Sequence, residues 1–323
     1  MKRSKITILL AIVLGMTFHS CLDLEPQDQL GGKNMWTSVN DYKQFANTFY
    51  SWTRDFSSVV YDGTHSDKRS DLITYQSYNE FSRGINSIPS SDANYTDNYK
   101  HIRRTNLLLQ NAEAYAKPED IKQYIGEAYF FRAYSYFDLL QLYGDVIITK
   151  KPLDITDPEM KVKRNDRSEV VDLIIDDLNH AVENLPAFKE LTTEEEGRIS
   201  KEGAQAFLSR VALYEGTWQK SRNGNQNTQR SANLLDIAAK AARTVIDAKY
   251  GYTFRLFGTD SETKILGDSA QKYMFILENE KSNPAGIKKS SNHEYIFARR
   301  HDQVLVQEKL RAVAQQQKEH IAI

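Results

Sequence analysis

The segment Ile121–Gly144, IKQYIGEAYFFRAYSYFDLLQLYG, decides the fold of this 323-residue chain. Its residues recur on one side at intervals of three and four: Ile125, Ala128, Arg132, Tyr136 and Leu140. This spacing predicts an α-helix with one buried face. Gly126 and Ala133 are small enough to let a neighbouring helix approach closely. Pro118 before the segment suits a helix start and Gly144 a helix end, so we expect a helix over 121–143.

Other parts of the chain show the same spacing. They predict helices over 35–56, 95–115, 168–185, 201–215 and 234–248. Ser168 is expected to cap one of them, and Gly216 to end another. Paired helices with small residues and aromatics at their crossings are typical of tetratricopeptide-like packing. The linkers differ in length, however, so we predict a mainly α, irregular tetratricopeptide-like helical-pair scaffold with long loops.

The chain changes in character beyond Tyr250. Alternating or continuous apolar residues predict a few short strands or extended segments, over 252–257, 273–277 and 294–297. Residues 303–323, rich in Gln and Lys, are weakly apolar and read as an atypical helical tail. The region 57–93 is rich in Gly, Ser, Asp and Asn, which predicts a long loop.

The N-terminus has the pattern of an export signal. Three basic residues among the first five precede a largely apolar run of 13 residues, 6–18, which is too short to span a bilayer. Ser20 directly before Cys21 suits a peptidase that cleaves before a lipid-modified cysteine. We therefore expect a lipoprotein signal over 1–20, a diacylglycerol and palmitate anchor on Cys21, and a polar tether over 21–34. The alternative is an ordinary secretory signal with an incidental free cysteine.

The composition of the chain and its motifs limit the classes of function to be considered. There are 42 Lys and Arg against 43 Asp and Glu, so the formal net charge of −1 gives no electrostatic footprint for nucleic acid. Cys21 is the single cysteine, which excludes an internal disulfide. No zinc-ligand spacing and no phosphate-binding glycine loop is present. We predict that the chain is not an enzyme and that it has no metal and no cofactor.

Five segments, in this order along the chain, resemble a known family. They are Cys21–Pro26, Tyr99-x-x-Ile102-x-x-x-Asn106, Gly126–Val146, Asp177–Pro186 and Gly197–Lys201 with Leu213–Tyr214. The chain resembles the SusD/RagB family, surface nutrient-binding lipoproteins of the Bacteroidota. The resemblance covers roughly residues 21–302, so we expect a SusD-like helical domain over 35–302.

The resemblance implies a function. Members of this family lie on the outer leaflet of the outer membrane, facing the cell exterior. They act as hinged lids over a TonB-dependent transporter of the SusC type. They capture oligosaccharides, or in some members peptides, and deliver them for import without chemical change. The expected partners are therefore a SusC-like transporter, a glycan or peptide ligand, and the membrane through the lipid anchor.

The candidate ligand-binding residues are chosen on physical grounds only, and not from the resemblance. Sugar sites place aromatic faces beside amide, carboxylate or guanidinium groups. One loop has this mixture, and one tryptophan lies near another polar loop: Tyr75, Tyr78, Asn79, Phe81, Arg83 and Trp218. The alternative is that these aromatics only fix loops to the scaffold.

The resemblance stops abruptly at Gln303, and the family usually runs considerably longer. Our hypothesis is a truncation or frameshift near Asp302, which would leave the helical domain incomplete and 303–323 unrelated to it. The alternative function is then a truncated or inactive family member that acts as a helical protein-interaction scaffold without a small ligand.

Overall fold

The computed structural model describes residues 35–53, 83–85, 87–154, 156–222, 228–274, 286–287 and 291–298. Helices dominate these residues, and the described ranges contain no sheet but only an isolated antiparallel bridge between Val146 and Asn165. The α-helices are α2 (Val39–Asn47), α4 (Ala93–Glu113), α5 (Lys122–Tyr143), α6 (Arg167–Asn184), α7 (Lys201–Arg222), α8 (Thr228–Ile246) and α9 (Ala270–Met274). The 3₁₀ turns are η2 (Thr48–Trp52), η4 (Pro118–Ile121), η5 (Pro158–Lys161), η6 (Phe188–Glu190) and η7 (Lys264–Ser269). The predicted mainly α scaffold is confirmed.

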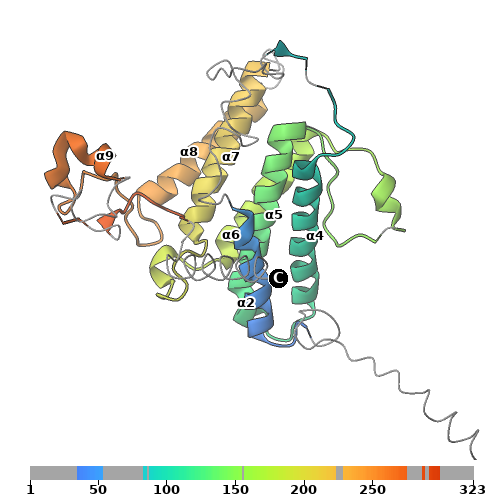
Figure 1. Cartoon of the computed structure of the whole chain (residues 1–323), viewed down its shortest axis with the longest axis horizontal. Helices are drawn as coiled ribbons and strands as arrows, with labels where there is room; N and C mark the ends of the chain where they lie inside the picture. Colours follow the sequence, from blue (N-terminus) through green and yellow to red (C-terminus); the bar gives the residue numbers. More distant parts are fainter. Residues whose placement is uncertain are drawn as a thin grey trace, which may run out of the picture.

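Helix α5 is the centre of the packing. It lies between α4 and α6, and α7 lies between α6 and α8 (Figure 1). Thirteen residues of α5 are buried, far more than one stripe of an amphipathic helix would be. Gly126 allows the end of α6 to approach, because a Cβ at this position would lie 2.9 Å from the backbone nitrogen of Leu185. The segment that predicted the fold is therefore the helix on which the others pack.

Buried ion pairs join these helices. Arg132 of α5 donates to both carboxylate oxygens of Asp177 in α6, and its Nη1 donates to Asn106 of α4 at 2.8 Å. Burial raises the pKa of the Asp177 carboxyl, and the Arg132 hydrogen bonds oppose this shift. The side chains of Arg132 and Asp177 are 6% and 0% exposed, so each charge depends on the other for its solvation.

Two further pairs link segments that are distant in sequence. Arg198, before α7, donates to both oxygens of Glu127 in α5 at 2.7 and 2.8 Å, and also to Asn47. Burial raises the pKa of the Glu127 carboxyl, while Arg198 lowers it in part. Arg167 at the start of α6 donates from Nε to Glu215 of α7 at 2.9 Å. The Glu127 and Glu215 side chains are both fully buried.

The starts of two helices differ from the sequence prediction. The first helix begins at Val39, after a Ser38–Asp41 capping box, and it gives way to a 3₁₀ turn at Thr48. The prediction of one helix over 35–56 is therefore wrong at both ends. Helix α6 is capped at Asp166, whose backbone N–H donates to the Glu169 carboxylate at 3.1 Å, so the prediction of Ser168 as the cap is wrong.

Gly216 does not end α7, as the sequence analysis predicted. The helix continues through it to Arg222. A Cβ at Gly216 would lie 3.0 Å from two side-chain atoms of Leu235, and its carbonyl accepts a hydrogen bond from Ser231 Oγ at 2.7 Å. The glycine therefore permits the close packing of α7 against α8. Helix α8 also starts earlier than the predicted residue 234, at Thr228.

The predicted strands are not found where the structure describes them. Residues 252–256 have no regular secondary structure and 257 begins a turn, while 294–297 form a turn, coil and bends. Two hydrogen bonds join these two regions: Arg255 N donates to His293 O at 3.1 Å, and Phe257 N donates to the Glu294 carboxylate at 2.9 Å. Residues 273–274 end helix α9, while 275–277 and the tail 303–323 lie outside the described residues. Without a paired neighbour, apolar spacing alone does not make a strand.

Candidate functional site

Most of the predicted ligand residues lie outside the described part of the chain. This applies to Tyr75, Tyr78, Asn79 and Phe81, and also to Cys21 with its signal and tether. Arg83 is described; it is exposed and precedes Gly84, whose φ is +66°. The loop that these residues form therefore stays a prediction.

Trp218 lies in the last turns of α7, half-buried beside two guanidinium groups. The Arg167 guanidinium carbon lies 4.3 Å from the ring centroid, and that of Arg222 lies 4.8 Å away. Tyr214, one turn earlier, stacks at 6.3 Å between centroids. Because Arg167 also pairs with the buried Glu215, the indole covers an ion pair between α6 and α7. These contacts give Trp218 a packing role; a ligand role is still a prediction.

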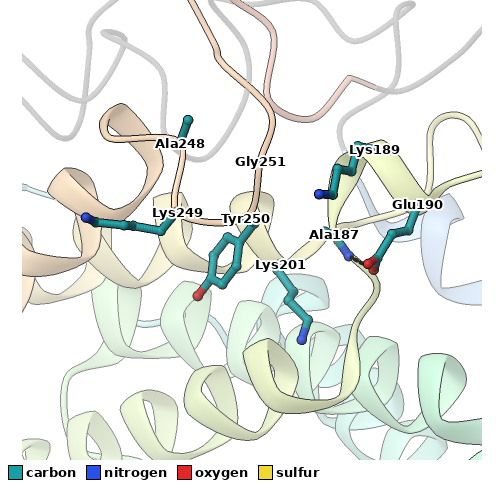
Figure 2. Close-up of a pocket in the computed structure, with 8 residues that line it drawn as sticks. All are labelled: Ala187, Lys189, Glu190, Lys201, Ala248, Lys249, Tyr250 and Gly251. Atoms are coloured by element: carbon teal, nitrogen blue, oxygen red, sulfur yellow. Dashed lines mark hydrogen bonds between the residues drawn. The ribbon is translucent and has the colours of Figure 1, made fainter.

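A cleft of about 290 Å³ opens where three segments meet: η6, the start of α7 and the turn after α8 (Figure 2). Its lining residues are Ala187, Lys189, Glu190, Lys201, Ala248, Lys249, Tyr250 and Gly251. Its volume lies near the lower end of the range for small-ligand pockets, roughly 300–1,000 Å³. The sequence analysis did not find this cleft, since lysines at 189, 201 and 249 share no local pattern.

A second, wider groove of about 610 Å³ runs between α6 and α8. Its wall is mostly carboxylate and amide, and its apolar lining residues are Ile175, Leu234 and Ile237. Arg230 crosses it and donates to Asp172 Oδ1 at 2.8 Å.

The described residues contain no group of three or more His, Cys, Asp or Glu side chains placed to hold a metal ion. No described helix is long and apolar enough to cross a membrane.

Comparison with known families identifies the scaffold. A SusD-like family model, described as starch-binding and associating with the outer membrane, matches residues 22–213. The chain belongs to the SusD-like family. The resemblance stated from the sequence is therefore confirmed. SusD-like proteins bind carbohydrate and are not catalysts, which agrees with the prediction that the chain is not an enzyme.

Individual SusD-like proteins show the same relationship. The chain is 28% identical over 233 residues to SusD-like protein P38 of Formosa agariphila, covering 66% of this chain and 42% of that protein. It is 26% identical over 316 residues to SusD-like protein P2 of the same organism, covering 91% and 59%. The chain thus spans about half the length of these curated relatives.

Solved structures agree on the fold. A SusD-like protein from Bacteroides fragilis superposes with a TM-score of 0.60 at 24% identity, over 86% of this chain and 48% of that one. A SusD-like carbohydrate binding protein from the same species gives 0.52 at 19% identity, over 71% and 44%. The helical arrangement in Figure 1 is therefore that of part of a SusD-like protein.

Proposed function

We propose that this SusD-like protein is a lipid-anchored binding protein of the outer membrane. It captures oligosaccharides, or peptides, and delivers them to a TonB-dependent transporter of the SusC type. The observation that carries the proposal is the match of residues 22–213 to a family model described as starch-binding and associating with the outer membrane. The carbohydrate-binding description of the second Bacteroides fragilis structure supports the glycan option.

The division of labour within the chain follows from its packing. The helices from α4 to α8 are held by buried ion pairs and apolar contacts, which suits a rigid support. The ligand would contact the loop from Tyr75 to Arg83, where aromatic faces can stack on sugar rings and Asn79 and Arg83 can bond hydroxyls. Trp218 would contribute only the part of its ring that Arg167 and Arg222 leave open.

Hydrogen exchange separates this function from its alternative, a helical interaction scaffold without a small ligand. The full chain is measured with and without each member of a glycan and peptide panel. Binding predicts slower exchange in the peptides that contain Tyr75 to Arg83 with at least one ligand. If exchange there is unchanged across the whole panel while a transporter still co-purifies with the chain, the scaffold function is favoured.

A further inference from the structure

The cleft between η6, α7 and α8 is positively charged, although the whole chain carries a formal charge of −1. Three of its lining residues are lysines, Lys189, Lys201 and Lys249, and only one, Glu190, carries a carboxylate. That carboxylate already accepts a hydrogen bond from Ala187 N at 2.8 Å. No carboxylate among the described residues forms an ion pair with any of the three lysines. Their charges are therefore available to a ligand.

The backbone around these lysines is held in place. Lys201 N donates to Pro186 O at 2.9 Å, which fixes the start of α7 to the η6 segment. After α8, Lys249 N donates to Thr244 O at 3.1 Å and closes the helix end. The Tyr250 hydroxyl accepts a hydrogen bond from Gln205 Nε2 at 3.1 Å, so its own hydrogen stays available to an acceptor. The half-buried ring offers an apolar surface beside the charges.

Gly251 lies against the end of the Lys189 side chain. Its φ of +85° suits glycine, and a Cβ there would lie 2.5 Å from Lys189 Nζ. Figure 2 shows Lys189 extending toward Gly251, Lys201 below Tyr250, and Lys249 extending away from both on the opposite side of the turn, so that the three ammonium groups are well apart. Such separated charges match a ligand that carries negative groups on successive units better than they match one compact anion.

We propose that this cleft binds an acidic oligosaccharide, one with carboxylate or sulfate groups on neighbouring sugar rings. The ammonium groups pair with these anions, and Tyr250 supports a sugar ring and donates to a hydroxyl or carboxylate oxygen. The inference rests on the proposed glycan-capture function and names the class of glycan.

The test is a titration of the full chain with an oligogalacturonide, a sulfated oligosaccharide and a neutral oligosaccharide of equal length. The variant Lys189→Gln/Lys201→Gln/Lys249→Gln is compared with a matched control, Lys117→Gln/Lys163→Gln/Lys220→Gln, whose exposed lysines do not line the cleft. We expect at least one acidic ligand to bind more tightly than the neutral one. The cleft variant should lose roughly ten- to hundredfold in affinity, and the control should lose little.

Three results overturn the inference. If both triple variants lose affinity equally, the acidic ligand binds by overall charge and not in the cleft. If the neutral glycan binds as tightly as the acidic ones and the cleft variant is unaffected, the cleft is not the site, while the glycan-capture function stands. The absence of binding to every glycan would remove this inference and the glycan option of the proposed function, and would leave only the peptide option. Circular dichroism of each variant confirms that it is folded.

Discussion

Arg132 donates two hydrogen bonds to Asp177, from Nε at 2.8 Å and from Nη2 at 2.6 Å, across 45 residues of sequence. The pair is buried between α5 and α6, and Asn106 of α4 completes the set of partners. This relationship joins three helices of the SusD-like scaffold.

Breaking this pair should destabilise the chain strongly. Arg132→Met leaves Asp177 buried without a partner, so we expect the free energy of unfolding to fall by about 3–5 kcal/mol. Arg103→Met is the control, because the Arg103 and Asp154 side chains are 55% and 83% exposed and 3.9 Å apart, and should cost at most about 1 kcal/mol. Urea unfolding measures the loss of free energy of unfolding in each variant. Equal losses would contradict the stabilising role of the buried Arg132–Asp177 pair.

Gly126 and Gly216 should respond differently to alanine. At Gly126 the new methyl would meet the backbone nitrogen of Leu185 at 2.9 Å, which cannot move without shifting the chain. We expect Gly126→Ala to lower the free energy of unfolding by about 1–3 kcal/mol. At Gly216 the contacts are side-chain atoms of Leu235 and the Cβ of Leu234, at 3.0 and 3.3 Å, so the loss should be smaller. Thermal unfolding compares the stabilities of the two alanine variants. A larger loss of stability for Gly216→Ala would contradict the claim that the backbone contact with Leu185 is the more costly one.

His101 should make stability fall in mild acid. It stacks on Trp52 at 4.1 Å, and burial lowers its pKa to about 4, while Asp97 opposes the shift. The unfolded chain, with a histidine pKa of about 6.5, then binds more protons between these values. The contribution is fully present above about pH 6.5 and declines as the pH falls toward 4. The melting temperature of the wild type should therefore fall relative to that of His101→Gln as the pH decreases from about 6.5 to 4, and parallel curves would contradict the assignment.

Trp218 should matter for stability. Removing the indole uncovers the Arg167–Glu215 pair, so Trp218→Ala should lower the free energy of unfolding by about 2 kcal/mol. Trp218→Phe, which keeps an aromatic face, should recover part of this. Chemical denaturation distinguishes them; if Trp218→Ala is as stable as the wild type but binds glycan less well, the packing role is wrong and a ligand role is favoured.

Cys21 should anchor the chain. In a Bacteroidota host, the wild type should be found in the outer-membrane fraction and should incorporate labelled palmitate. Cys21→Ala should lose the label and leave the membrane, because a multi-chain anchor supplies most of the membrane affinity. A label that persists in the variant would place the lipid elsewhere, and a wild type without label would favour the ordinary secretory signal.

The helices could be read from the sequence because their spacing is local. The segment 121–143 was predicted almost to the residue, since Pro118 and Gly144 mark its ends. Gly216 was misread because a glycine that ends a helix and one that admits a neighbouring helix look alike until the neighbour is known. Asp166 and not Ser168 caps α6, and because both residue types cap helices well, residue type alone does not separate them.

The candidate site was less predictable than the helices, because its residues are distant in sequence and meet only in the folded chain. Asp177 is 45 residues from Arg132, and the three lysines of the cleft come from segments that meet only after folding. No spacing rule relates Lys189 to Lys249. The aromatic loop was suggested by composition alone, and of its five residues only Arg83 lies within the described part.

The most direct test of the central claim, capture of an oligosaccharide without chemical change, is calorimetric titration of the full chain with neutral and acidic oligosaccharides, followed by chromatography of the recovered ligand. Glycan capture predicts saturable binding of at least one member of the panel, with the ligand recovered at its original length. No saturable binding to any glycan, or recovery of a shortened one, would contradict it.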